Sequence, residues 1–153
     1  MALIDSAKCL TYNEIKMIDQ TTAKVRIAVI DDEKMLLSVF SSMMRHYHYH
    51  ADFFSNPLKA LQTIIGNPSR YHIILLDIRM PQMDGISFAK QVRNILPNLP
   101  IIFMTGVSAA EVRDQAMALG HVHFLEKPFP LDETLRDVIP KILADSAKKE
   151  TGT

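Results

Sequence analysis

The sequence predicts an α/β fold: a doubly wound parallel sheet built from five successive βα units, (βα)5. Short apolar runs of β-forming residues alternate along the chain with longer stretches in which apolar residues recur every three or four positions. The run Ile73–Leu76 is apolar on both faces, as a central parallel strand covered by helices must be. This alternation requires right-handed crossovers, with helices on both faces of the sheet.

The first two units occupy residues 25–66. A strand is predicted at 25–30 and a weaker one at 49–54, and each is followed by apolar residues at helical spacing. Gly66-Asn67-Pro68 ends the second helix. The predicted apolar positions of the two helices are Leu36, Val39, Phe40 and Met43, and then Leu58, Leu61, Ile64 and Ile65.

The last three strands are predicted at 73–76, 101–104 and 123–125. Asp84 is a suitable N-cap for the helix after the first of them. The next helix is predicted to begin at a capping box, Ser108–Glu111. Gly120 stands at its predicted C-terminus, where a residue with positive φ is favoured. The apolar positions of the third and the closing helices are Ile86, Ala89, Val92 and Ile95, and then Leu131, Leu135, Val138, Ile139 and Ile142.

Two stretches and one proline fall outside the regular pattern. Residues 1–24 form an N-terminal extension, in which Thr11 and Glu14 could cap a short helix. The repeated units fill residues 25–144, and we expect 145–153 to be a flexible tail. Pro140 lies inside the closing helical pattern, where we expect a kink.

Composition excludes several classes of protein. The 153 residues carry 17 Lys+Arg and 17 Asp+Glu, so the basic excess of a dedicated nucleic-acid-binding protein is missing. The single cysteine excludes an internal disulfide. No apolar run approaches the length of a membrane span, and no secretory signal opens the chain. We therefore expect a cytoplasmic protein without membrane insertion or direct binding of nucleic acid.

Polar side chains stand just after four of the predicted strands, at the edge where an open parallel sheet binds ligands. Taken singly, each of these residues is most simply explained as part of a turn or as a helix cap, but together they indicate a functional site. They are Asp31 and Asp32 after the first strand, Asp77 after the third, Thr105 after the fourth and Lys127-Pro128 after the fifth.

Three carboxylates gathered at one edge would repel one another, by about 4 kcal/mol per pair at ~4 Å. Such a cluster takes up protons or binds a divalent cation, and oxygen ligands without His or Cys favour Mg²⁺, with Mn²⁺ as the alternative. Lys127 and the hydroxyl of Thr105 are then suited to phosphoryl oxygens. These residues indicate phosphoryl transfer, with Asp77 as the nucleophile.

Four motifs surround these polar residues. They are Ile30-Asp31-Asp32-Glu33, Leu76-Asp77-Ile78-Arg79-Met80-Pro81-x-Met83-Asp84-Gly85, Met104-Thr105-Gly106 and Lys127-Pro128-Phe129. Together they resemble the signatures of bacterial response-regulator receiver domains. The similarity extends from about Val25 to Leu143 and implies a flavodoxin-like sheet with strand order 2-1-3-4-5.

The resemblance implies that Asp77 is the phospho-acceptor, with a histidine kinase or a histidine phosphotransfer protein as donor. Asp32, Asp77 and the backbone carbonyl of Arg79 would ligate Mg²⁺, and Asp31 would act through a bound water. Lys127 would contact the phosphoryl group, and its bond to Pro128 would be cis.

The resemblance also implies a switch. Thr105 would move toward the phosphoryl group, and Phe124 matches the aromatic switch position. Their movement would reshape the face formed by the fourth helix, the fifth strand and the closing helix, which a downstream protein reads. We expect a monomer or a weak, phosphorylation-dependent dimer. The only catalysis expected is self-phosphorylation and autodephosphorylation, so the chain is not expected to be an enzyme acting on outside substrates.

Some positions depart from the family pattern. Gly106 stands where alanine is common, and Phe124 lacks the hydroxyl of the more usual tyrosine. Arg79 and Val107 occupy positions that tune how long the phosphate survives.

Other interpretations fit less well or remain open. A haloacid-dehalogenase-type phosphatase would need a second Asp where Arg79 stands, and a flavin mononucleotide binder would need a Gly-rich loop in place of Asp31-Asp32-Glu33. The alternatives left open are a receiver segment of a longer hybrid kinase or transcription regulator, and a pseudo-receiver that acts only through contact.

Histidines and methionines are the remaining candidate ligands. His46, His48 and His50 alternate like metal ligands but are better explained as surface residues. The methionines, among them Met35, Met43, Met44 and Met117, are interpreted as core filler.

Overall fold

The computed structural model describes residues 24–106 and 110–152. It contains one parallel sheet with the strand order β2-β1-β3-β4-β5, which confirms the predicted fold and order. The strands are β1 (Arg26–Ile30), β2 (His50–Phe54), β3 (Ile73–Asp77), β4 (Ile101–Thr105) and β5 (Val122–Glu126).

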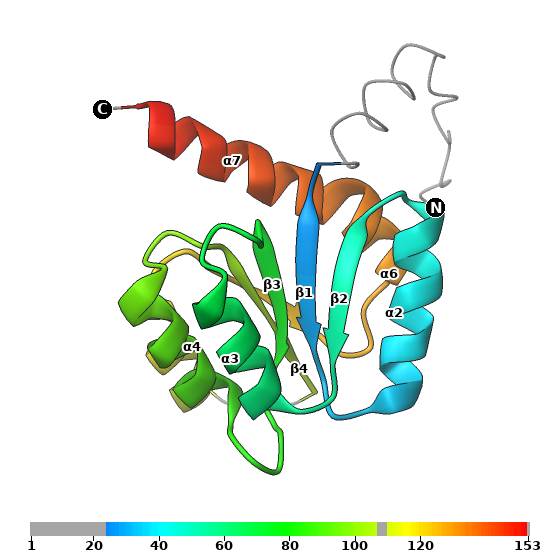
Figure 1. Ribbon diagram of the computed structural model, residues 1–153, viewed down its shortest axis with the longest axis horizontal. Helices are drawn as coiled ribbons and strands as arrows, with labels where there is room; N and C mark the ends of the chain where they lie inside the picture. The colour runs from blue at the N-terminus through cyan, green and yellow to red at the C-terminus, as the bar shows by residue number, and fades with distance from the viewer. Residues whose placement is uncertain (1–23, 107–109, 153) are drawn as a thin grey trace, which may run out of the picture.

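Helices cover both faces of the sheet (Figure 1). The α-helices α3 (Pro57–Gly66), α4 (Gly85–Ile95) and α5 (Ala110–Met117) pack on one face. The other face is covered by α2 (Lys34–His46) and by a closing helical run, which comprises α6 (Leu131–Glu133), the π-helix η1 (Thr134–Val138) and α7 (Ile139–Thr151). Among the residues described, no helix is long and apolar enough to cross a membrane.

Each inner strand sends alternate side chains into two separate cores. In β3, Ile74 and Leu76 face α3, α4 and α5, while Ile73 and Leu75 face α2 and the closing helices. All four side chains are fully buried, as predicted for a central strand covered on both faces. The strand is therefore rigidly held up to Asp77, its last residue.

The predicted apolar face of α2 is confirmed in part. Phe40 is fully buried, and Leu36 and Met43 are partly buried against the core, but Val39 is 52% exposed. The other buried side chains of the helix are Leu37 and Met44. The helix contains adjacent leucines and adjacent methionines, so the sequence is compatible with two phases. As the helix packs on the sheet, the second residue of each pair is the one that is fully covered: Leu37 and Met44.

Other apolar side chains also lie outside the core. Met35 and Met117 are 85% and 59% exposed, so their interpretation as core filler is wrong. Leu58 and Ile95, predicted on the inner faces of α3 and α4, are nearly half exposed. The three alternating histidines are exposed, as predicted: His46, His48 and His50.

The closing helical run differs from the prediction in two ways. The disturbance expected at Pro140 is a π-helix, in which the Ile139 N–H donates to the Thr134 carbonyl, and the helix then continues. A widened turn just before proline accommodates its missing N–H. The tail predicted to be flexible is helical as far as Thr151, and there the Ser146 hydroxyl donates to the carbonyl of the buried Ile142 at 3.0 Å.

Local signals for helix ends are confirmed where the structure describes them. The Asp84 carboxylate accepts a hydrogen bond from the Ser87 N–H at 3.0 Å, as an N-cap does, and Gly120 has a φ of 68°. The predicted cap at Thr11–Glu14 lies outside the described residues, and so does the extension 1–24 apart from Lys24. The predicted capping box Ser108–Glu111 includes residues that the structure does not describe.

Candidate functional site

Three carboxylates meet at the carboxyl end of the sheet. Asp31 directly follows β1, and Asp77 ends β3, which pairs with β1 in parallel. One carboxylate oxygen from each of Asp31, Asp32 and Asp77 lies within 4.8 Å of the others. Asp31 is fully buried and Asp77 is 6% exposed, while Asp32 faces solvent. Strand pairing thus brings together residues that are far apart in the sequence.

Lys127 reaches this cluster from the loop after β5. Its Nζ lies 3.0 Å from Oδ2 of Asp31 and 3.6 Å from Oδ2 of Asp77. Its backbone N–H donates to the carbonyl of Thr105 at 2.7 Å, which ties the loop to the end of β4. The peptide bond from Lys127 to Pro128 is cis, as the family resemblance implied. The loop therefore places the ammonium group directly beside the carboxylates.

The electrostatics of the cluster are unbalanced. Burial, with the neighbouring charges of Asp31 and Asp32, raises the pKa of Asp77 to about 6, although Lys127 and a backbone hydrogen bond from Arg79 oppose the rise. Burial would lower the pKa of Lys127, but its hydrogen bond to Asp31 and the surrounding carboxylates raise it overall. One ammonium group thus does not offset three carboxylates.

The donor set fits a hard divalent cation. The clustered side chains offer only carboxylate oxygens, and Mg²⁺ and Mn²⁺ prefer oxygen ligands. The pKa of Asp77 is raised first by burial and then by the charge of Asp31, and a cation bound at the cluster would oppose both effects. The residues therefore have both the chemistry and the excess charge that a Mg²⁺ site needs.

Thr105 and Phe124 stand on β4 and β5, the two strands that complete the sheet on one side of β3. Thr105 is the last residue of β4 and is half-buried. The ring of Phe124, in β5, stacks on Phe103 with centroids 5.7 Å apart, and the guanidinium of Arg113 lies 4.8 Å from its centroid. The structure thus places Thr105 at the carboxyl edge and Phe124 in the packed layer between β5 and α5.

Gly85 supports the site in a way that the sequence analysis missed. A Cβ at this position would lie 2.5 Å from the carbonyl oxygen of Asp77 and 2.8 Å from the Cα of Ile78. The Gly85 N–H donates to the Ile78 carbonyl at 2.7 Å. The start of α4 therefore packs backbone against backbone on the residue that carries the central carboxylate. The Asp84-Gly85 pair after a strand was the only signal in the sequence.

Glu33 was also missed as a neighbour of the cluster. Its carboxylate lies 4.0 Å from the Nζ of Lys127, and its backbone N–H donates to Oδ1 of Asp31 at 2.9 Å. Glu33 is well exposed, so its charge is screened by solvent. Its backbone contact contributes more clearly, because it fixes the orientation of the buried Asp31.

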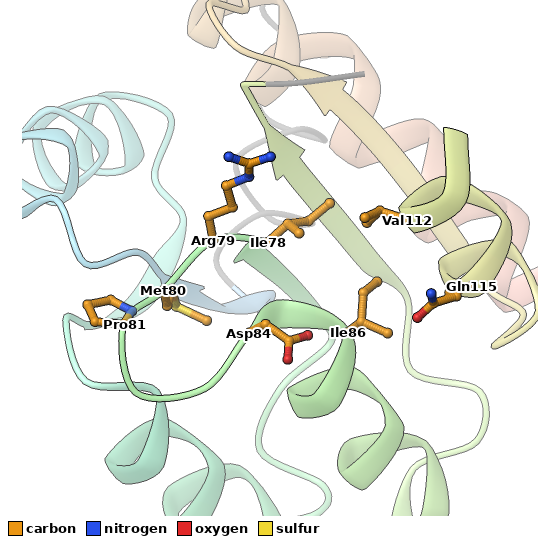
Figure 2. A pocket seen from close by; sticks show the side chains of 8 residues that line it. All are labelled: Ile78, Arg79, Met80, Pro81, Asp84, Ile86, Val112 and Gln115. Atoms are coloured by element: carbon orange, nitrogen blue, oxygen red, sulfur yellow. The ribbon is translucent and has the colours of Figure 1, made fainter. Parts of the chain in front are cut away.

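A groove flanks the site between the loop after β3 and helix α5. Figure 2 shows side chains from the loop and the start of α4 on one side, and Val112 and Gln115 of α5 on the other. Its volume is about 620 Å³. The lining residues are Ile78, Arg79, Met80, Pro81, Asp84, Ile86, Val112 and Gln115.

Comparison with known proteins gives consistent matches. Residues 27–139 match the family model described as the response regulator receiver domain. The transcriptional regulatory protein ZraR of Salmonella typhimurium is 30% identical over 129 residues, which is 84% of this chain and 28% of ZraR. The regulatory protein AtoC of Escherichia coli is 32% identical over 130 residues, 84% of this chain and 28% of AtoC. The chain thus spans less than a third of the length of these relatives.

A solved structure of similar length supports the same grouping. The chemotaxis protein CheY4 of Vibrio cholerae superposes with a TM-score of 0.69 at 25% sequence identity. The match covers 77% of this chain and 98% of CheY4. The sheet and its flanking helices are therefore shared with a protein that consists almost entirely of the matched region.

Proposed function

This chain belongs to the response regulator receiver domain family of two-component signalling, and on that premise we propose that Asp77 accepts a phosphoryl group from a phosphohistidine. The donor is a histidine kinase or a histidine phosphotransfer protein. One observation carries the proposal: the nearly buried carboxylate of Asp77 lies among Asp31, Asp32 and Lys127. This arrangement suits a carboxylate nucleophile that needs a positive charge beside it.

The transfer exchanges one bond to phosphorus for another. A carboxylate oxygen of Asp77 attacks the phosphorus, the P–N bond breaks, and its electron pair stays on the imidazole of the donor. The product is an acyl phosphate on Asp77. Lys127, whose Nζ lies 3.6 Å from Oδ2 of Asp77, offsets charge on the phosphoryl oxygens. The Thr105 hydroxyl donates to another of these oxygens.

Mg²⁺ is the cation proposed for the acidic cluster, with Mn²⁺ as the alternative. Asp32, Asp77 and the backbone carbonyl of Arg79 would hold it, and Asp31 would contribute through a water molecule. When bound, the ion supplies positive charge to the phosphoryl oxygens and keeps Asp77 ionised. This effect of the ion matters for Asp77, because burial raises the pKa of its carboxyl group to about 6.

The phosphoryl group acts as a regulatory signal and is not part of turnover on an outside substrate. Thr105 and Phe124 are the residues proposed to respond, and the surface of α5, β5 and α7 is the face proposed to bind a downstream protein. Arg79 and Val107 are proposed to tune the lifetime of the phosphate. We also propose that the protein is a monomer or a weak, phosphorylation-dependent dimer and that it makes no direct contact with nucleic acid.

The test is the intact mass of the protein after incubation with acetyl phosphate and Mg²⁺. We expect one phosphoryl adduct, which is lost in Asp77→Asn and in the presence of EDTA. Asp114→Asn, an exposed carboxylate on α5, is the matched control and keeps the adduct. An adduct that persists in Asp77→Asn would show that the nucleophile is another residue. Lack of an adduct from both acetyl phosphate and a phosphohistidine donor would contradict the proposed chemistry.

A further inference from the structure

The closing helical run contains one turn that differs from the rest. In the π-helix η1, the Ile139 N–H donates to the carbonyl of Thr134, and not to that of Leu135 as it would in an α-helix. The next residue is Pro140, which has no N–H. In the π register, the carbonyl that an N–H at position 140 would reach is again that of Leu135. Neither of the two residues that could supply a helical donor to the Leu135 carbonyl therefore does so.

The hydroxyl of Tyr49 supplies the missing donor. Tyr49 directly precedes β2, and its hydroxyl donates to the Leu135 carbonyl at 3.0 Å. Both residues are buried, with 6% and 1% of their surface exposed, so water does not readily replace this hydrogen bond. Burial raises the pKa of Tyr49 to about 12, so the hydroxyl keeps its proton at neutral pH. A side chain from outside the helix thus completes the π-turn.

Other hydrogen bonds hold both partners in place. The Tyr49 N–H donates to the carbonyl of Met44 at 2.9 Å, which ties Tyr49 to the last turn of α2. In the closing run, the N–H and the hydroxyl of Thr134 both donate to the carbonyl of Pro130, at 3.0 Å and 2.9 Å. The hydrogen bond from Tyr49 to Leu135 therefore joins two segments that are each fixed by contacts of their own.

A continuous α-helix is the alternative register for the closing run. In that register the Ile139 N–H would donate to the Leu135 carbonyl, and the ring of Pro140 would clash with the carbonyl of Arg136. The π-turn holds one residue more than an α-turn, which rotates α7 relative to α6 by about 100°. The choice of register thus decides which side chains of α7 face outward.

We propose that Tyr49 is a positioning residue that, together with Pro140, holds the closing run in the π register and so sets the rotation of α7. Pro140 disfavours the α register through its ring. The Tyr49 hydroxyl stabilises the π register, because it pairs a buried carbonyl that would otherwise be left without a donor. This device does not require phosphorylation at Asp77. Only its consequence rests on the proposed function, since α7 belongs to the face proposed to bind a downstream protein.

The first test is a double-mutant cycle on Tyr49 and Pro140, measured by urea denaturation. Tyr49→Phe removes the hydroxyl and keeps the ring, whereas Pro140→Ala restores an N–H to the turn. We expect Tyr49→Phe to lower the folding equilibrium constant about tenfold in the wild-type background and less than about twofold in the Pro140→Ala background. An equal loss in both backgrounds would overturn the inference, because the hydroxyl would then not substitute for the missing N–H.

Tyr71→Phe is the matched control for this cycle. Tyr71 is also buried and its hydroxyl donates to Asp52 at 2.7 Å, but it lies in the core on the opposite face of the sheet from Tyr49. Its effect on the folding equilibrium constant should be the same with and without Pro140→Ala.

The second test identifies the register from the scalar coupling across the hydrogen bond of the Ile139 N–H, in protein labelled with ¹⁵N and ¹³C. Wild type and Tyr71→Phe should show a coupling to the Thr134 carbonyl. In Tyr49→Phe we expect a coupling to the Leu135 carbonyl, which has lost its other donor. A spectrum of Tyr49→Phe that keeps only the coupling to Thr134 would overturn the inference. Neither test uses a phosphodonor, so failure of this inference is distinguished from failure of the proposed function.

Discussion

The ammonium group of Lys127 lies 3.0 Å from Oδ2 of Asp31, a side chain with no exposed surface. The two residues follow β5 and β1, which are separated in the sheet by β3 and β4. The contact therefore crosses the carboxyl edge and passes beside Asp77 on β3, whose Oδ2 is 3.6 Å from the same nitrogen. One cation links three strand ends at the site.

Replacing Lys127 with alanine should destabilise the protein in the absence of divalent cations. The change leaves the buried charge of Asp31 without its partner, which typically costs about 3 kcal/mol or more. The free energy of unfolding is measured by urea denaturation in EDTA. Lys141→Ala, at an exposed position on α7, is the control, and an equal small loss in both variants would contradict the prediction. We also expect Lys127→Ala to uncouple phosphorylation from the switch.

Asp77 should make stability depend on pH in a direction that follows from its raised pKa. The pKa of about 6 in the folded state lies above the ordinary 3.8, so the folded protein favours the protonated carboxyl. The stabilisation that the Asp77 carboxyl gives to the folded state is fully present below pH 3.8 and is lost as the pH rises through 6. In EDTA, wild type should therefore lose about 2 kcal/mol of stability relative to Asp77→Asn between pH 4 and 7.

Asp52 is the matched control for this experiment, because its shift has the opposite sign. Burial alone would raise the pKa of Asp52, but hydrogen bonds from Tyr71 and Arg70 lower it overall. The stabilisation that ionised Asp52 gives to the folded state is present above the ordinary pKa of an Asp side chain and is lost only at more acid pH. The difference between wild type and Asp52→Asn should thus be flat between pH 4 and 7. A flat curve for Asp77→Asn as well would contradict the prediction.

Magnesium should stabilise the folded protein through the carboxylate cluster. A ligand that binds only the folded state at a hundredfold excess over its Kd adds about 2.7 kcal/mol. Thermal unfolding with and without MgCl₂ measures this gain. Asp32→Ala removes an exposed carboxylate of the cluster and should abolish it, whereas Asp114→Ala on α5 should keep it. Equal gains in both variants would show that the stabilisation is nonspecific.

Gly85→Ala should distort the site, because the new Cβ would lie 2.5 Å from the carbonyl oxygen of Asp77. The backbone must move apart, which we expect to cost about 1–3 kcal/mol of stability. The rate of labelling by acetyl phosphate should fall as well. Gly66→Ala is the control, since a Cβ there meets nothing within 4 Å. Normal labelling of Gly85→Ala would show that the loop after β3 adapts without affecting Asp77.

Much of the fold and the site was predictable from local patterns. The run Ile73–Leu76 was predicted to be a covered inner strand, because it is short, apolar on both faces and lies within an alternating βα pattern, and the structure buries all four side chains. Once the strands are parallel, their carboxyl ends share an edge. Asp31, Asp77 and Lys127 were therefore expected to meet there, and the structure brings them together.

The sequence by itself thus determined the order of strands and helices, the edge that carries the site and the residue types gathered there. Only the tertiary structure decided the phase of α2, the close packing of Gly85 on Asp77, the sandwich around Phe124 and the raised pKa of Asp77. The physical reason is that periodicity and strand ends are local properties of the chain. Packing distances and burial arise only when distant segments meet.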